Sequence, residues 1–252
     1  MTFFKAADIS INFGGIKAVD GVNFEVKEGD VFTIIGPNGA GKTTIFNLVS
    51  RIYDASTGQL VFRDQDITRV PPHRIARLGI ARTFQNIELF QYASVLHNLL
   101  LGRHAHRQSK LWEEVLFLPK VRRMELAHRE RVEEIIDFLD LQQYRDALIV
   151  NLPYGVRKVV ELARALCTEP KLLLLDEPSS GLNVEETEDM AFWIQDIRNL
   201  LGITVLMVEH DMSLVSAVSD RVLALNYGRV LAEGTAREVQ SHPDVVKAYL
   251  GG

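Results

Sequence analysis

Gly36-Pro37-Asn38-Gly39-Ala40-Gly41-Lys42-Thr43-Thr44 fits the phosphate-binding pattern G-x-x-x-x-G-K-[ST] at every fixed position. The run follows residues 31–35, which are apolar and rich in β-branched side chains, as in a buried strand. Apolar residues then recur at helical spacing over 45–52. A strand, a glycine-rich turn and a helix together direct backbone N–H groups at one anion. The pattern therefore predicts a nucleotide-binding loop.

Within this loop, we expect Lys42 to reach the β- and γ-phosphates and Thr43 to place its hydroxyl on Mg2+. The remaining nucleotide contacts are expected from neighbouring positions of the run, namely Asn38, Gly39, Ala40, Gly41 and Thr44. A glycine-rich turn without a ligand is the alternative. The flanking strand and helix favour the phosphate site over it.

The composition is that of an ordinary globular protein, with 252 residues, 47% hydrophobic and 24% charged. A net charge of -5 supplies no broad positive field, so no nucleic-acid partner is expected. The N-terminus lacks a basic region followed by an apolar core, and no stretch has the length of a membrane span. We therefore expect a cytosolic protein. The single cysteine, Cys167, excludes an internal disulfide and is expected to be a buried structural thiol.

The apolar pattern divides the chain into three stretches. Residues 3–85 begin with alternating apolar and polar positions that are typical of strands. Residues 86–151 are helical in character, with an apolar stripe over 132–139. Over 152–252, short apolar runs alternate with helical segments, as in a parallel sheet buried on both faces. We therefore expect one α/β domain over 3–252, into which a helical subdomain at 86–151 is inserted.

Two acids, Asp176 and Glu177, follow the apolar run 172–175. They lie at the carboxyl end of a predicted strand, where open α/β sheets bind ligands. Phosphoryl transfer needs mainly positioning and charge stabilisation. Asp176 can hold Mg2+ through water, and Glu177 can orient and polarise the water that attacks the γ-phosphate. Strand-end acids are common, so this assignment depends on the phosphate loop in the same chain.

Three further residues are candidates for the same site. His210 follows the strand predicted over 203–208, and its imidazole can bond the γ-phosphate or the attacking water. Gln85 can offer its amide oxygen to the metal or the water, although a lone glutamine proves nothing. Phe13 can stack on the adenine ring. The alternatives are a surface or core histidine for His210 and a core phenylalanine for Phe13.

The order of these features resembles the motif series of ATP-binding cassette (ABC) ATPases over essentially the whole chain. In chain order, the series consists of the phosphate loop, Gln85, the segment 152–155, the pair Asp176-Glu177, the segment 180–183, and His210. The resemblance implies an α/β fold, namely a P-loop NTPase ABC nucleotide-binding domain with an antiparallel β subdomain and an inserted helical subdomain. It also implies that the ligands are ATP and Mg2+.

The resemblance further implies a role for each candidate. Glu177 is the catalytic base, His210 the switch histidine and Gln85 the Q-loop residue, while Phe13 stacks on adenine. Mg2+ is held by Thr43, Gln85 and Asp176. In this family two ATPase domains pair head to tail, and each ATP lies between one P-loop and the signature segment of the other domain. Hydrolysis is therefore expected only in a dimer.

The signature segment departs from the family pattern. The usual Leu-Ser-Gly-Gly-Gln is replaced by Leu152-Pro153-Tyr154-Gly155-Val156. Proline has neither a hydroxyl nor an N–H, so two donors to the partner's γ-phosphate are missing. Gly155 keeps its N–H, and the helix that follows can still aim its N-terminus at the phosphate. We expect a weakened but working site, in which Pro153, Tyr154, Gly155 and Val156 contact the ATP bound to the partner. Asn183 replaces the usual aspartate at the same interface, where we expect it to alter communication between the two ATP sites.

Three features resemble the ATP-binding subunits of bacterial branched-chain (hydrophobic) amino-acid importers. They are the Pro-Tyr-Gly form of the signature, the long helical insertion that begins at Asn86, and the ending 225–235 closed by 247–251. Such transporters combine two different ATPases, two membrane permeases and a secreted solute-binding protein. The resemblance implies a peripheral protein at the cytoplasmic face of the bacterial inner membrane, paired with a second ATPase. Importers for urea and for aromatic or other organic acids belong to the same subgroup, so the solute stays open.

A contact with the permeases is also implied, because in this family a cytoplasmic permease helix inserts beside the loop that contains Gln85. The candidates for an apolar groove that receives the helix are Ile87, Leu89, Phe90 and Tyr92. Internal packing of the helical subdomain is the alternative for each of them.

Two functions from other classes remain as alternatives. One is a soluble, non-transport ABC ATPase that reshapes a complex, although the coiled-coil or DNA-binding insertions usual in repair ATPases are not visible. The other is an ATP-dependent dimerisation module with negligible hydrolysis, which Pro153 and Asn183 favour. Lipopolysaccharide-exporting ATPases are the nearest alternative within transport, but they usually keep the intact Ser-Gly-Gly signature.

Overall fold

The computed structural model describes residues 2–106 and 119–250. Two sequence-based predictions fall partly outside them, namely residues 107–118 of the helical insertion and Gly251 of the C-terminal motif. Within the described residues, no helix combines the length and the apolar character needed to cross a bilayer.

The chain divides into two compact units, an α/β unit (Met1–Gln85 with Lys171–Gly252) and a helical unit (Asn86–Pro170). The helical unit therefore ends at Pro170 and not at 151, where the sequence placed the end of the insertion. The physical reason is helix packing, because α6 (Tyr154–Leu166) packs on α3 (Val95–Gly102). The signature segment thus belongs to the helical unit.

A six-stranded sheet forms the centre of the α/β unit, in the order β10-β9-β3-β8-β7-β6. Neighbouring strands from β9 to β6 are parallel, and β10 is antiparallel at the edge. The strands are β3 Val31–Ile35, β6 Ile80–Arg82, β7 Leu172–Asp176, β8 Thr204–Val208, β9 Arg221–Asn226 and β10 Arg229–Gly234. Every residue of β3, β7 and β8 is buried, as their continuous apolar runs predict.

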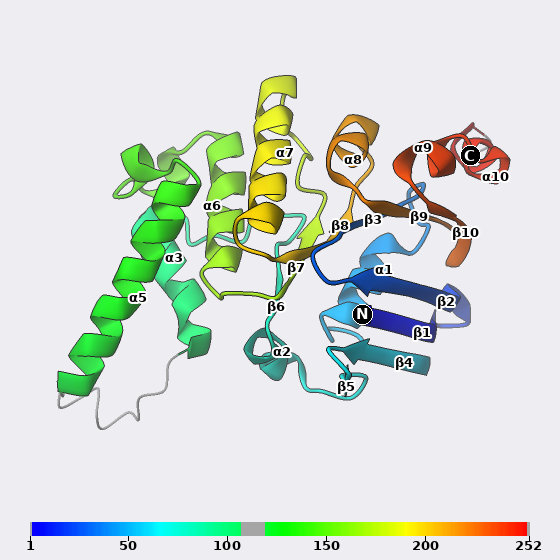
Figure 1. Ribbon diagram of the computed structural model, residues 1–252, viewed down its shortest axis with the longest axis horizontal. Helices are drawn as coiled ribbons and strands as arrows, with labels where there is room; N and C mark the ends of the chain where they lie inside the picture. The colour runs from blue at the N-terminus through cyan, green and yellow to red at the C-terminus, as the bar shows by residue number, and fades with distance from the viewer. Residues whose placement is uncertain (1, 107–118, 251–252) are drawn as a thin grey trace. The chain divides into compact units, whose positions relative to one another are not determined.

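A second, antiparallel sheet has the order β2-β1-β4-β5 (Figure 1). Its strands are β1 Thr2–Phe13, β2 Ile16–Lys27, β4 Thr57–Phe62 and β5 Gln65–Asp66. The turn between β1 and β2 consists of Gly14 and Gly15, whose φ angles are positive, a conformation that glycine adopts without a steric penalty. The predicted antiparallel β subdomain is confirmed.

One apolar core joins the two sheets through α1 (Lys42–Val49), whose buried Ile45, Phe46 and Leu48 belong to the same cluster as residues of both sheets. The helix ends at Val49, so Ile52, which the spacing placed on it, lies beyond the helix and is 49% exposed. The other helices of the unit are α2 Pro72–Leu78, α7 Val184–Asn199, α8 Met212–Val218, α9 Ala236–Gln240 and α10 Pro243–Leu250. A second cluster includes Ile35 and residues of β9, α8 and α9, so the large sheet is covered on both faces.

The helical unit is built on α3, α5 (Pro119–Phe138) and α6, with short 3-10 helices at Arg103–His106, Gln142–Tyr144 and Ile149–Asn151. The predicted stripe over 132–139 is buried, as an amphipathic helix facing a core requires. Cys167 is buried here too, and burial raises the pKa of its thiol to about 12, which fits the predicted structural thiol.

Candidate nucleotide-binding site

The carboxyl ends of three neighbouring parallel strands bring the predicted motifs of the α/β unit to one edge. In the register, Ile34 of β3 and Asp176 of β7 both pair with Val208 of β8. The phosphate loop follows β3, the two acids end or follow β7, and His210 follows β8. Residues more than a hundred positions apart therefore meet where open α/β sheets bind ligands.

The phosphate loop turns between β3 and α1 on glycines with positive φ, 151° at Gly36, 80° at Gly39 and 102° at Gly41. Asn38 and Gly39 are exposed, and Ala40 is buried beneath them. Lys42, Thr43 and Thr44 form the first turn of α1. The strand, turn and helix that the sequence predicted are thus confirmed.

We expect Gly41→Ala to lower the free energy of unfolding more than Gly39→Ala. Both glycines have positive φ, so an alanine at either position should cost about 1–2 kcal/mol in backbone strain. A Cβ at Gly41 would also lie 2.5 Å from the carbonyl oxygen of Ala18, whereas one at Gly39 would meet nothing within 4 Å. Urea unfolding of both variants measures the difference, and equal losses would contradict the close approach at Gly41.

Lys42 is held inside the loop. Its Nζ donates to the carbonyl oxygens of Gly36, at 2.7 Å, and Pro37, at 3.1 Å, and the residue is 6% exposed. Burial lowers the pKa of its ammonium, while the charges of Glu177 and Asp176 act in the opposite direction. Within the described residues this buried cation hydrogen-bonds only to carbonyl groups, so it is well prepared to exchange them for an anionic ligand.

Asp176 is buried at the end of β7 and pairs through one of its oxygens. Its Oδ2 accepts a hydrogen bond from Arg82 Nη2 at 2.6 Å. Its Oδ1 has no hydrogen-bond partner among the described residues. A buried carboxylate oxygen without a donor is unusual and fits a magnesium-bound water. Carboxylate, hydroxyl and amide oxygens are ligands that Mg2+ prefers, so Asp176, Thr43 and Gln85 are a suitable donor set.

Arg82 is a residue that the sequence analysis did not single out. Its guanidinium bonds Asn47 Oδ1 at 2.7 Å and Ser50 Oγ at 3.0 Å in addition to Asp176. It also lies over the rings of Phe46 and Phe84. One side chain thereby connects α1, β6 and the buried acid that ends β7.

We expect Arg82→Met to destabilise the protein by about 3–5 kcal/mol, because it leaves the carboxylate of Asp176 buried without its cation. Urea unfolding without nucleotide measures the loss. Arg229→Met is the matched control, since the guanidinium of Arg229 pairs with Asp20 but is 72% exposed, and little change is expected there. Equal effects of the two substitutions would contradict the importance of the buried pair.

Glu177 lies directly after β7 with a positive φ of 50°, a conformation that a non-glycine residue rarely adopts. Its backbone N–H donates to the carbonyl of Val208 at 2.9 Å. Its carboxylate accepts a hydrogen bond from Gln85 Nε2 at 2.9 Å and lies 3.9 Å from Nδ1 of His210. The structure therefore brings Gln85, Glu177 and His210 together, as the sequence-based assignment requires.

Phe13 ends β1 and is 43% exposed. Its ring packs edge-on against Tyr53, with the centroids 5.2 Å apart. It is therefore not a core phenylalanine, and an exposed aromatic ring can stack on a flat ligand.

The signature segment starts α6 in the helical unit. Pro153 is its N-cap residue and supplies no side-chain cap, Tyr154 is 46% exposed, Gly155 is buried and Val156 is partly buried. Arg157 donates to the carbonyl of Leu152 and fixes the entry to the helix. The helix predicted after the signature is confirmed.

Asn183 caps α7 in the α/β unit. Its Oδ1 accepts from the backbone N–H of Glu186, and the Glu186 carboxylate accepts from the N–H of Asn183, each at 2.9 Å. This capping box satisfies two backbone donors of the helix start. Asparagine is as good a cap as aspartate, so the local structure accommodates this departure from the family pattern.

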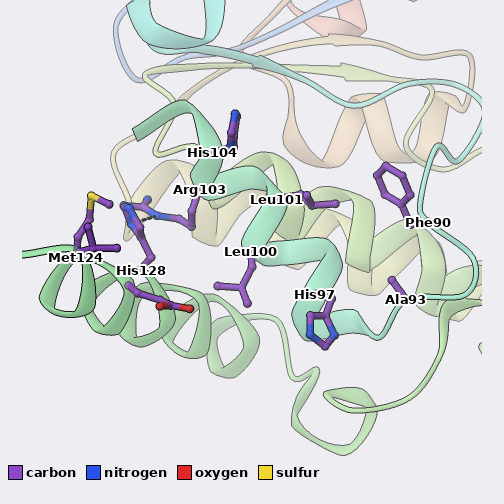
Figure 2. A pocket seen from close by; sticks show the side chains of 11 residues that line it. Phe90, Ala93, His97, Leu100, Leu101, Arg103, His104, Met124 and His128 are labelled. Carbon is purple, nitrogen blue, oxygen red and sulfur yellow. Dashed lines mark hydrogen bonds between the residues drawn. The ribbon is translucent and has the colours of Figure 1, made fainter. Parts of the chain in front are cut away.

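The helical unit contains a cavity of about 670 Å3 between α3 and α5 (Figure 2). Its lining includes Phe90, His97, Leu101 and Met124. Of the four residues proposed for a permease groove, Leu89 is buried and Ile87 partly buried, whereas Phe90 and Tyr92 are 61% and 84% exposed. Internal packing is therefore the better account of Leu89.

Comparisons with known proteins identify the family of the chain. Residues 19–180 match the ABC transporter family, and residues 229–252 match the branched-chain amino acid ATP-binding cassette transporter family. The chain is 39% identical over 98% of its length to the high-affinity branched-chain amino acid transport ATP-binding protein BraF of Pseudomonas aeruginosa, covering 97% of that protein. It is 39% identical over 96% of its length to LivG of Escherichia coli K12, a protein of the same description, covering 95% of it.

Among solved structures, the ADP conformation of MJ1267, an ATP-binding cassette of an ABC transporter, superposes with a TM-score of 0.86 at 31% identity, with both chains fully covered. The dimeric bacterial cassette MJ0796 has a TM-score of 0.77 at 23% identity, over 93% of this chain and 99% of that one, and at this identity shows the fold alone. By the family match and the full-length relatives, the chain belongs to the ABC transporter family as one of its ATP-hydrolysing cassettes.

Proposed function

We propose that this chain is the ATP-hydrolysing subunit of a membrane importer for branched-chain or other hydrophobic amino acids. The observation that most strongly supports hydrolysis is the cluster in which Gln85 and His210 both face the carboxylate of Glu177. The match of residues 229–252 and the names of the relatives support the solute class.

In the proposed mechanism, the Lys42 ammonium pairs with the β- and γ-phosphates of ATP. Asp176, Thr43 and Gln85 hold Mg2+, which when bound neutralises charge on the transferred phosphoryl group. Glu177 accepts the proton of the attacking water. His210 hydrogen-bonds the γ-phosphate and keeps it beside that water.

The adenine and the partner-facing residues complete the proposal. Phe13 stacks on the adenine ring, which its exposure at the end of β1 supports. The signature residues Pro153 to Val156, together with Asn183, contact the ATP of a second ATPase subunit in a head-to-tail dimer. That subunit is a different protein in the assembled importer, so each heterodimer contains two non-identical ATP sites.

The remaining partners are two membrane permeases and, indirectly, a secreted solute-binding protein, which places this chain on the cytoplasmic face of the inner membrane. We assign the permease contact to the surface of Phe90 and Tyr92, because both rings are exposed. Phe90 lines the cavity of the helical unit, and Tyr92 directly precedes Ala93, which also lines it. Tyr92→Glu should weaken co-purification with the permeases. Tyr227→Glu, at an equally exposed tyrosine of the α/β unit, is the control and should not.

The test of the function is the rate of ATP hydrolysis by the chain alone, with its paired ATPase, and with the paired ATPase, both permeases and the loaded binding protein. An importer subunit should hydrolyse ATP fastest in the complete assembly with the loaded binding protein. A rate that does not change when the permeases are added would favour the soluble ABC ATPase. No hydrolysis in any mixture would favour the dimerisation module. A screen of the binding protein against amino acids, urea and organic acids would then identify the solute.

A further inference from the structure

Glu209 is a completely buried acid between β8 and His210. Its Oε1 accepts hydrogen bonds from the backbone N–H of Ser179, at 2.9 Å, and from the Ser179 hydroxyl, at 2.6 Å. Its Oε2 accepts from the backbone N–H groups of His210, at 2.7 Å, and Asp211, at 3.1 Å. Four donors from two separate loops thus converge on one carboxylate.

This arrangement continues the pairing of β7 and β8 beyond the end of the sheet. The ladder ends at Asp176 and Val208, followed by one hydrogen bond from Glu177 N–H to the carbonyl of Val208. Beyond that point the two strands continue as separate loops, and hydrogen bonds to the side chain of Glu209 connect them in place of backbone pairing. A buried carboxylate is costly unless its oxygens are well satisfied, so the donors of both loops are held to it.

The loops joined in this way carry the two groups that face each other in the site. Ser179 lies two residues after Glu177, and His210 directly follows Glu209. The imidazole of His210 is 56% exposed, and its Nδ1 lies 3.7 Å from Oε2 of Glu209 and 3.9 Å from the carboxylate of Glu177. Glu209 therefore bears on the separation of His210 and Glu177 in two ways, through the backbones that it connects and through its own carboxylate beside the imidazole.

We propose that Glu209 is a positioning residue for ATP hydrolysis, which holds the loop of Glu177 and the loop of His210 at their working separation. This inference rests on the proposed roles of Glu177 and His210. The turn after Ser179 is tied to the same point, because the N–H of Leu182 donates to the carbonyl of Ser179 at 3.0 Å. Glu209 therefore also anchors the segment that leads to the partner-facing Asn183.

Glu209→Gln keeps the shape of the side chain but replaces one acceptor oxygen by an NH2 group, which then faces a pair of donors. We expect kcat to fall about 10- to 100-fold, the range that loss of a hydrogen bond to a charged group predicts. The dissociation constant of ATP should stay within about twofold, because the loop contacts of Lys42 are untouched. Ser179→Ala removes only the 2.6 Å contact and should lower kcat less, and Ser179→Thr, which keeps a hydroxyl, should restore it.

The experiment measures kcat and KM for ATP, equilibrium binding of a fluorescent ATP analogue, and the imidazole NMR resonance of His210, assigned by its loss in His210→Asn. Asp220→Asn is the matched control. Its side chain also accepts a hydrogen bond from the backbone of a strand, the N–H of Val31, but it does so at the amino end of β3, away from the site. The control should lose stability without a change in kcat or in the His210 resonance. Ser179→Ala leaves the charge of Glu209 beside His210 in place and should still shift that resonance, and Glu209→Gln should lower kcat at unchanged KM.

A parent value of kcat in Glu209→Gln would overturn the inference. If that variant does not fold, the comparison of Ser179→Ala with Ser179→Thr decides, and equal kcat in both would overturn it as well. Glu177→Gln separates this failure from that of the proposed function. Hydrolysis that survives in Glu177→Gln contradicts the proposed base itself, whereas its loss there combined with parent kcat in Glu209→Gln contradicts only the role of Glu209.

Discussion

Glu177→Gln should lower the rate of ATP hydrolysis by about 10^2- to 10^4-fold, the contribution of a well-placed general base. The amide keeps the size of the side chain, and its oxygen can still accept from Gln85. It cannot accept a proton from water, so ATP should bind but not turn over. Single-turnover hydrolysis and equilibrium ATP binding measure the two effects separately.

Glu233→Gln is the matched control for this substitution. Its carboxylate accepts from Arg221 on β9 and takes no part in the cluster of Gln85 and His210. Parent rates are expected for the control. Undiminished hydrolysis in Glu177→Gln would show that another group is the base.

Lys42→Ala should weaken ATP binding by about 10- to 100-fold, because it removes a charged donor that the phosphates would meet in a partly buried loop. The lysine is held by the carbonyls of Gly36 and Pro37, so the loop itself presents the ammonium at the ligand. The dissociation constant from fluorescence titration with an ATP analogue is the measurement.

Lys247→Ala is the control, since Lys247 is an exposed lysine of α10 that lines a hollow beside Asn38 and Gly39. It tests whether any positive charge near the loop strengthens ATP binding, and we expect the ATP dissociation constant to change by less than about twofold. An ATP dissociation constant that is unchanged in Lys42→Ala would contradict the phosphate-binding role of the loop.

Local patterns carried most of the fold prediction. The continuous apolar runs before Gly36 and Asp176 correspond to β3 and β7, because a strand buried on both faces leaves that signal in the sequence. The stripe over 132–139 corresponds to the buried face of the last turns of α5 and to Leu139 directly after it, because an amphipathic helix repeats its apolar residues every three to four positions. The end of the helical unit at Pro170 was not predictable, because it depends on which helices α6 packs against.

The site was predictable where a motif has a fixed spacing and was missed where distant residues meet. The placement of Gln85, Glu177 and His210 in one cluster agrees with the assignment, although their catalytic roles remain proposals. Arg82 contacts a carboxylate 94 residues away, and the partner of Glu209 is 30 residues away. Neither separation has a local pattern, so only the sheet order reveals these contacts.

The most direct test of the account uses this chain alone, with a second copy in the place of the paired ATPase. It mixes two inactive variants, Lys42→Ala and Gly155→Asp, at a protein concentration where the parent chain alone hydrolyses ATP. If each ATP site consists of the phosphate loop of one chain and the signature of another, the mixed dimer contains one complete site. Random pairing should then restore about a quarter of the parent rate, although each variant alone is inactive. A mixture that stays as inactive as its components would contradict the claim that the phosphate loop of this chain is half of a shared site.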